Sequence, residues 1–302
     1  MMNVKQLKYV LLLAREGSFA KAAELLNISQ PSLSQYVKKI EQQLGQQLFD
    51  RSGGTVRLTD AGQIYIDAGR KILELERQMH NQFNDLAEHK SGSVIVGTSP
   101  YRSAAMMPII AKRFQEQYPG MHIVVEEMTS QELTEAAKHG QFDMCITMKP
   151  VNDRIFQCEK IAEEELILAV PRSFPAFDSL NMPNRKYPAI DAAKINNQPF
   201  VLITEGQWMQ QALDNISLDY CLSLKTAAVV KSLEAQIAMV RAGIGMALLP
   251  SGIKCFCAPD EVNYYSFVQE LPKRDVVVMW QRERRLSSIS NDLIKIMKEI
   301  SW

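Results

Sequence analysis

A single apolar stripe on a long helical segment, residues 60 to 89, limits how this chain can fold. Seven residues make up the stripe, separated by 4, 4, 3, 4, 4 and 3 positions: Ile64, Ala68, Ile72, Leu75, Met79, Phe83 and Leu86. This spacing is typical of a coiled coil of about four heptads. A helix with one apolar side is not stable alone in water, so it needs a partner. The partner is either the same helix of a second chain or the body of its own chain.

The helical segment divides the 302 residues into three parts. We expect a head at residues 1–60, a linker helix at 61–89 and a body at 90–302. The composition, 46% hydrophobic and 23% charged, is that of a globular protein in which each domain has its own core. The chain as a whole has a formal net charge of zero, but its first 60 residues contain eight basic and five acidic side chains. This asymmetry is compatible with a nucleic-acid-binding head on an acidic body.

The sequence contains no candidate membrane span. No apolar run approaches the roughly 18 residues that cross a bilayer. The N-terminal stretch MMNVKQLKYVLLLAREG has a short apolar patch, but Ala-Arg-Glu follows it rather than a small-residue cleavage site. We therefore interpret this stretch as a helix and expect a cytoplasmic protein without a membrane partner.

Metal binding, disulfides and catalysis have no support in the residue patterns. The five cysteines are odd in number and irregular in spacing, which argues against structural disulfides. Cys255 and Cys257 are one residue too close for a C-x-x-C motif, and the four histidines are scattered. The chain has no H-E-x-x-H, G-x-S-x-G or P-loop motif, and the stretch AGIGMA lacks the third glycine of a dinucleotide fingerprint. We expect no metal, no cofactor and no enzymatic activity.

The head has the pattern of three short helices. The predicted core positions of the first helix are Leu7, Val10, Leu11 and Ala14, and those of the third are Leu33, Val37, Ile40 and Leu44. Ser18 and Ser29 are suited to cap the second and third helices, and Asn27 tolerates the left-handed backbone of a tight turn between them. Two helices joined in this way form a helix-turn-helix.

The outer side of the third helix carries short hydrogen-bonding groups rather than pairs of Glu and Lys. The candidate DNA-binding residues here are Ser29, Gln30, Pro31, Ser32, Ser34, Gln35 and Lys38. Glutamine can bond adenine with two hydrogen bonds, serine can bond either kind of base, and lysine reaches guanine or phosphate. The alternative is an ordinary solvated surface helix.

A predicted wing follows the third helix. The stretch from Leu48 to Arg57 contains an apolar anchor, a turn at Gly53-Gly54 and a short alternating strand. Arg51 and Arg57 lie where such a wing reaches the DNA backbone or the minor groove. Both arginines are also compatible with a purely solubilising role.

The body alternates strands and helices and is predicted to be α/β, with mostly parallel strands in two lobes. Lobe 1 comprises about residues 93–163 and 268–302, and lobe 2 about 164–267. Expected strands are 93–99, 121–128, 142–148, 165–171, 199–204, 222–229, 244–250 and 275–281, and expected helices begin at about 104, 131, 207, 231 and 287.

Ligands of open α/β sheets bind beyond the carboxyl ends of the strands, where helix N-termini present free amides. The positions expected at this edge are Ser99, Tyr101, Arg102, Ser103, Thr129, Ser130, Met148, Thr204 and Trp208. Helix N-termini together with Arg102 suit a small anion, most simply a carboxylate. Alternatively, Ser99, Thr129 and Thr204 only cap helices.

The stretches FAKAAELLNISQPSLSQYVKKIEQQLGQQLFDR and VRLTDAG closely resemble the winged helix-turn-helix of LysR-type transcriptional regulators. The stretch MVRAGIGMALLPSG, residues 239–252, is similar to the regulatory domain of the same family. The resemblance implies a periplasmic-binding-protein-like body, with a small-molecule effector bound between the lobes at the positions given above. It further implies a homodimer formed through the linker helix, two half-sites in double-stranded operator DNA, assembly into a homotetramer, and RNA polymerase as a further partner.

Two other functions remain open on the sequence alone. In the first, the regulator responds to oxidation, with Cys221 and either Cys255 or Cys257 as the switch. In the second, the body is a solute-binding or enzymatic domain and the head serves only assembly. The absence of a signal peptide opposes solute binding, and the lack of a catalytic motif opposes an enzyme.

Overall fold

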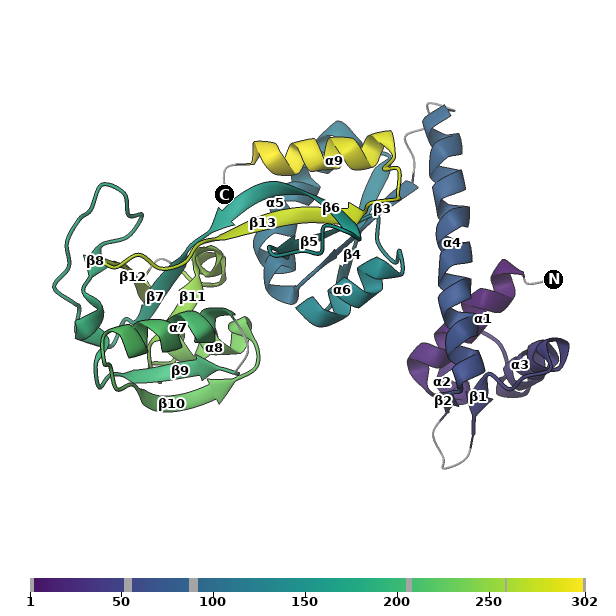
Figure 1. The fold of residues 1–302 in the computed structure, drawn as a ribbon, viewed down its shortest axis with the longest axis horizontal. Helices are drawn as coiled ribbons and strands as arrows, with labels where there is room; N and C mark the ends of the chain where they lie inside the picture. The colour runs from purple at the N-terminus through teal and green to yellow at the C-terminus, as the bar shows by residue number, and fades with distance from the viewer. Residues whose placement is uncertain (1–2, 52–55, 87–91, 205–207, 259, 301–302) are drawn as a thin grey trace.

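A computed structural model describes residues 3–51, 56–86, 92–204, 208–258 and 260–300. The chain forms a small helical head, a long helix and a two-lobed α/β body (Figure 1). The predicted wing turn at Gly53-Gly54 and the end of the expected linker helix, residues 87–89, lie outside the described residues.

The head is a three-helix bundle with a two-stranded wing. Its elements are α1 (Val4–Glu16), α2 (Phe19–Leu25), α3 (Gln30–Leu44), β1 (Phe49–Asp50) and β2 (Arg57–Leu58). The strands are antiparallel, with Phe49 opposite Leu58. Asn27 adopts a φ of 53° in the turn before α3, and the side chains of Ser18 and Ser29 cap α2 and α3 as predicted.

Two details of the predicted head core are wrong. Leu44 is 46% exposed, because it occupies the last turn of α3, beyond the helices that cover Leu33 and Val37. In α1 the residue that is buried together with Leu7 and Val10 is Leu13, whereas Leu11 and Ala14 are only half-buried. Leu13 lies three residues after Val10 on the side of the helix that faces the bundle.

The long helix α4 (Asp60–Leu86) begins inside the head. The Thr59 hydroxyl donates to the Gln47 carbonyl at 2.6 Å and accepts from the Gly62 amide at 3.0 Å. A Cβ atom at Gly62 would lie 2.0 Å from the carbonyl oxygen of Leu48. Tyr65 and Ile66, one turn further on, are buried in the head core, so the first turns of α4 are part of the bundle.

We expect Gly62→Ala to lower the free energy of unfolding by at least about 2 kcal/mol. The new Cβ is fixed to the backbone of α4 and the atom it meets is the backbone carbonyl oxygen of Leu48, so neither can move away without shifting the main chain. Gly69→Ala is the matched control, since a Cβ there meets only the end of the Leu7 side chain. Chemical denaturation followed by circular dichroism measures both. Equal stabilities of the two variants would contradict the close contact.

The predicted apolar stripe lies on the outer side of α4. Its described members are exposed to solvent in the single chain: Ile64 (71%), Ile72 (39%), Leu75 (64%), Met79 (48%) and Phe83 (57%). Ala68 is half-buried, and the side chain of Leu86 lies outside the described part of the chain. The body of the same chain therefore does not cover the exposed residues.

Lobe 1 is a five-stranded sheet covered on both faces by helices (Figure 1). Its elements are β3 (Gly92–Thr98), α5 (Pro100–Gln117), β4 (Met121–Glu127), α6 (Ser130–Lys138), β5 (Met144–Met148), β6 (Phe156–Glu164), β13 (Arg274–Gln281) and α9 (Ser288–Glu299). The strand order is β4-β3-β5-β13-β6. Helices α5 and α9 share the larger core, and α6 packs on the opposite face.

Lobe 2 combines two small sheets. Its elements are β7 (Leu166–Pro171), β8 (Ala189–Ile190), η1 (Ala192–Ile195), β9 (Pro199–Ile203), α7 (Trp208–Asp219), β10 (Lys225–Val230), α8 (Leu233–Arg241), β11 (Ala247–Pro250), η2 (Ser251–Phe256) and β12 (Val262–Phe267). The strand orders are β11-β7-β12-β8 and β10-β9. A bridge between Phe200 and Met246 joins the two sheets.

The prediction of mostly parallel strands is wrong, because both lobes have mixed sheets. Strand β3 runs parallel to β4 and β5, but β13 is antiparallel to β5 and β6, and β7 is antiparallel to both of its neighbours. The chain leaves lobe 1 through β6 and returns through β13, so these neighbouring strands run in opposite directions (Figure 1). Strands β6, β8 and β12 were not predicted.

A buried ion pair connects three segments at one end of lobe 1. The side chains of Asp143 and Arg284 are 2% and 3% exposed and form a salt bridge. Arg284 also donates to the Phe142 carbonyl, and Asp143 accepts the Ile95 amide at 2.7 Å. The pair therefore links β3, the start of β5 and the segment between β13 and α9.

Candidate functional site

Helix α3 presents its polar side to solvent while its apolar side is sealed in the head. Leu33, Val37 and Ile40 are buried at 0–3% exposure. Of the predicted DNA-binding residues on this helix, the exposed ones are Ser29, Gln30, Pro31, Ser32, Gln35 and Lys38, and Ser34 is half-buried. The side chain of Gln35 makes no hydrogen bond to the described residues and is available to a ligand. The predicted face is thus brought together on one side of the head.

The wing arginines differ in their surroundings. Arg51 donates to the Ser34 hydroxyl at 3.3 Å, lies 3.5 Å from a Glu41 carboxylate oxygen and covers the ring of Phe19 at 4.6 Å. Arg57, opposite Asp50 in the wing, is exposed and has no salt bridge within the described residues. Arg51 therefore fixes the wing to α3, whereas Arg57 is free to contact a phosphate.

Sequence reasoning missed the role of Glu41. Its Oε1 atom accepts the amides of Leu48 and Phe49 at 2.9 and 3.3 Å, while Oε2 faces Arg51. One carboxylate on α3 thus satisfies the backbone at the start of the wing and aligns its arginine. The signal that was available is the motif IEQQLG, in which Glu41 stands at a position that the resemblance already includes.

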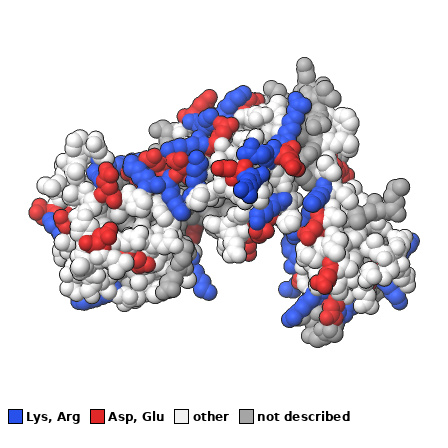
Figure 2. All heavy atoms as spheres, viewed as in Figure 1, with Lys and Arg blue, Asp and Glu red and all other residues white. Residues whose placement is uncertain are grey.

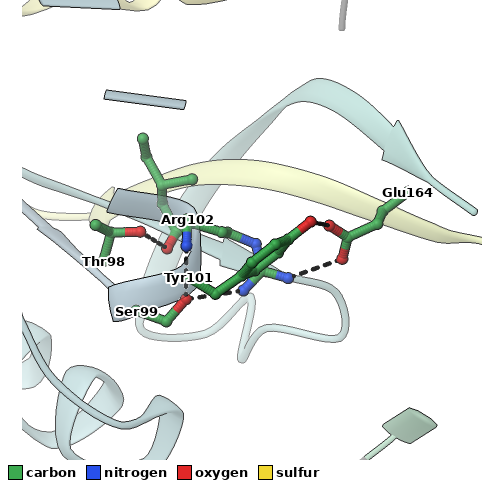
Figure 3. A network of polar contacts seen from close by, with 6 residues as sticks. Thr98, Ser99, Tyr101, Arg102 and Glu164 are labelled. Atoms are coloured by element: carbon green, nitrogen blue, oxygen red, sulfur yellow. Dashed lines mark hydrogen bonds and ion pairs between the residues drawn. The ribbon is translucent and has the colours of Figure 1, made fainter. Parts of the chain in front are cut away.

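In the body, Arg102 and Tyr101 meet the carboxylate of Glu164, as Figure 3 shows. The Tyr101 hydroxyl donates to Glu164 Oε1 at 3.0 Å, and Arg102 Nη2 lies 3.0 Å from Oε2. The three residues are only 5–8% exposed. Burial, followed by the charge of Glu164, raises the pKa of Tyr101, so the phenol stays protonated and remains the donor. The arginine that was predicted to meet an anion therefore already has a carboxylate partner in its own chain.

Several other predicted effector-binding residues serve as caps or internal donors. Ser99 accepts the Arg102 amide and caps α5, and Thr129 caps α6 in a reciprocal arrangement with Glu132. Hydrogen bonds from Thr129 lower the pKa of Glu132. The Thr204 hydroxyl donates to the Val230 carbonyl at 3.0 Å.

The other predicted effector-binding residues neither cap a helix nor donate a side-chain hydrogen bond within the described residues. Ser130 is exposed, and Ser103 and Met148 are half-buried. Trp208 is half-buried as the first residue of α7.

Arg274 is a candidate that sequence reasoning missed. It is the first residue of β13, pairs with Glu164 in the register of the sheet, and its guanidinium lies 5.0 Å from the ring centre of Trp208. Arg274 also lines a pocket of about 480 Å³ with Lys149, Pro150, Val151, Asp153, Lys273 and Asp275. Its position where the chain re-enters lobe 1 was the available signal, but the contact with Trp208 is visible only in three dimensions.

The cysteines form no disulfide. All five are free thiols; Cys221 and Cys255 are exposed, and Cys257 is half-buried. Desolvation raises the pKa of Cys255, which lowers the fraction of the reactive thiolate. The described residues contain no cluster of three or more possible metal ligands, and among them no helix is long and apolar enough to cross a membrane.

Comparison with known proteins covers nearly the whole chain. Residues 4–63 match the family model of the bacterial regulatory helix-turn-helix protein of the lysR family, and residues 87–301 match that of the LysR substrate binding domain. The chain is 24% identical over 308 residues to the uncharacterised HTH-type transcriptional regulator YcgK of Bacillus subtilis (strain 168), covering 99% of this chain and 94% of YcgK.

Two solved structures share the fold. The LysR family transcriptional regulator CbnR superimposes with a TM-score of 0.71 at 22% identity, covering 98% of each chain. Full-length CbnR in complex with its target DNA gives a TM-score of 0.69 at 21% identity, covering 98% of this chain and all of that chain (100%). With a helix-turn-helix head, a long helix and a two-lobed body that match over these lengths, the chain belongs to the LysR family of DNA-binding transcriptional regulators.

Proposed function

We propose that this regulator reads a specific operator through the exposed side of α3, and that a small carboxylate bound between the lobes of the body controls this binding. The observation that carries the proposal is the α3 face itself, where Gln35 is exposed and unbonded while the opposite side is buried. Neutral donors and acceptors on a helix that is free to enter a major groove suit base recognition. The body matches the LysR substrate binding domain, which removes the interpretation of the body as an enzyme.

The exposed stripe of α4 supports a homodimer. Leu75 and Phe83 are 64% and 57% exposed, which is costly for large apolar side chains that recur at heptad spacing. Pairing with the same helix of a second chain buries them and provides two heads for the two half-sites of an operator. We further propose that dimers assemble into a homotetramer, and that the complex acts in the cytoplasm, with RNA polymerase as a partner.

Two arginines near the junction of the lobes support control by an anion. Arg274 of lobe 1 lies over the ring of Trp208 in lobe 2, and Arg102 pairs with Glu164 at the end of β6. An effector can shift DNA binding only through its different affinities for two arrangements of the lobes. The oxidation-sensitive alternative has less support, because desolvation raises the pKa of Cys255, one of its candidate switch residues.

The direct test compares Gln35→Ala with Arg57→Ala on an operator selected from random DNA. Gln35→Ala should lose about 1–3 kcal/mol of discrimination at one base pair, because its bidentate contact disappears. Arg57→Ala should weaken binding to all sequences and reduce the slope of log affinity against log salt concentration by about 1. Fluorescence anisotropy with single-base operator variants measures both effects. A Gln35→Ala protein with unchanged base preferences would remove Gln35 from the recognition surface.

A further inference from the structure

We infer that Arg274, rather than Arg102, holds the carboxylate of the effector, and that its contact with Trp208 transmits the bound state from one lobe to the other. This inference rests on the proposed function, in which the effector is a carboxylate bound in the cleft. It assigns the anion to one side chain and narrows the effector to a small molecule with one carboxylate at this position.

The first step is the pairing of charges where the lobes meet, a region in which Lys, Arg, Asp and Glu crowd together (Figure 2). Lys149 faces Asp275 at 3.9 Å. Lys273 faces Glu163 and Glu165 at 3.1 and 2.6 Å. Each lysine therefore has an acidic partner.

Arg274 differs from these lysines. Its sheet neighbour Glu164 is directed to Arg102 and Tyr101, and no described carboxylate forms a salt bridge with Arg274. Burial, followed by the charge of Arg102, lowers the pKa of Arg274. A half-buried cation beside a second cation is costly, and an anion at this point offsets that cost.

Arg102 is poorly placed to bind the anion. Its Nη atoms are bonded to Glu164 and Ser99, and the residue is only 8% exposed. The Nε atom of Arg102 is buried without a hydrogen-bond partner. An anion has poor access to it, because both Nη atoms of the same guanidinium are already hydrogen-bonded. Arg102 contributes charge to the cleft and keeps Glu164 away from Arg274.

Arg274 borders open space that fits a small molecule. A pocket of about 480 Å³, lined by residues of lobe 1 alone, lies beside it and is within the range of small-ligand sites. Its lining includes three cationic side chains, and two of them, Lys149 and Lys273, already have acidic partners. Pro150 and Val151 supply an apolar wall. These features match one carboxylate on a compact, partly apolar molecule.

The contact between Arg274 and Trp208 couples effector binding to the relative placement of the two lobes. Arg274 belongs to the sheet of lobe 1, whereas Trp208 opens α7 in lobe 2. A guanidinium that lies over an aromatic ring still has its planar edge free for two hydrogen bonds to a carboxylate. An anion on this edge binds to an arginine that touches both lobes, so its affinity depends on how the lobes are placed.

The test uses full-length protein and three carboxylates, acetate, benzoate and succinate, with sodium chloride as the ionic-strength control. Thermal unfolding and isothermal calorimetry report binding, and operator anisotropy reports regulation. We expect Arg274→Gln to weaken binding of the preferred carboxylate at least about tenfold, and Arg274→Lys to weaken it less, since lysine keeps the charge but loses the paired donors. Arg113→Gln, which removes an exposed charge from α5, is the matched control and should bind as the wild type does.

Trp208→Leu tests the coupling separately. It should retain most of the carboxylate affinity, because Arg274 is intact, but bring the ratio of operator affinities with and without carboxylate closer to one. If Trp208→Leu leaves this ratio unchanged, the coupling role is overturned.

The remaining outcomes separate the inference from the proposed function. Wild-type binding that persists equally in Arg274→Gln overturns the role of Arg274 and leaves the proposed function standing. Binding that is lost in Arg102→Gln but kept in Arg274→Gln assigns the anion to Arg102 and also overturns the inference. If no carboxylate binds the wild type or changes its operator affinity, the proposed effector class fails, and the inference fails with it.

Discussion

Leu75→Glu is expected to disrupt the proposed pairing of α4 helices, to leave the protein monomeric and to lower its operator affinity by about 10²–10⁴-fold. Leu75 lies at the centre of the α4 stripe and is 64% exposed in the single chain. A glutamate there places two like charges opposite each other in an apolar seam. Without pairing, the second head no longer binds as part of the same molecule, and the gain from bivalent binding disappears. Sedimentation velocity and operator anisotropy measure the two effects.

The control for this variant is Lys71→Glu, an exposed position on the same helix that lies outside the stripe. It should remain dimeric and keep most of its affinity, apart from any long-range effect of the changed charge. A Leu75→Glu protein that sediments as the wild type would show that the subunits associate through another surface.

Arg284→Met is expected to lower the free energy of unfolding by about 3–5 kcal/mol. The substitution leaves the carboxylate of Asp143, 2% exposed, without its cationic partner inside lobe 1. Urea denaturation of the full-length protein, followed by circular dichroism, measures the loss. The neighbouring Arg285→Met removes the same charge from an exposed side chain and should change stability by no more than about 0.5 kcal/mol.

A double variant separates loss of the ion pair from loss of packing. Asp143→Asn with Arg284→Met has no buried charge at this site, and the new amide oxygen can still accept the Ile95 amide. We expect it to be more stable than Arg284→Met alone by at least about 1 kcal/mol. If the double variant is the less stable of the two, the cost comes from packing around Arg284 and not from the isolated charge.

The head was largely predictable because its signals are local. The cap at Ser29, the left-handed Asn27 and the stripe of Leu33, Val37 and Ile40 each depend on residues within one or two turns. The exposure of Leu44 was missed, because helical spacing alone does not show where the covering helices end. The link from Glu41 to the wing joins residues seven to ten positions apart across an irregular segment, where periodicity gives no information.

The body was less predictable for the same reason. Strand β6 has the sequence FQCEKIAEE, whose charged residues obscure the alternation of a strand, yet it pairs along the whole length of β13. Arg102 and Glu164 are 62 residues apart, so no local pattern reveals that Arg102 already has a carboxylate partner. Arg274 and Trp208 come together only when the chain returns from lobe 2.

The close fit of Gly62 against Leu48 and the burial of Tyr65 and Ile66 have a mechanical consequence. The helical bundle of the head and α4 must move as one rigid body, because the first turns of α4 are part of the core of the head. The 27 residues of α4 extend over about 40 Å, so a tilt of about 5° at the body end sweeps the head through an arc of roughly 3.5 Å. That arc is close to the rise of one base pair, about 3.4 Å. In the proposed dimer, a small reorientation of the two α4 helices is therefore enough to move α3 into or out of register with its half-site.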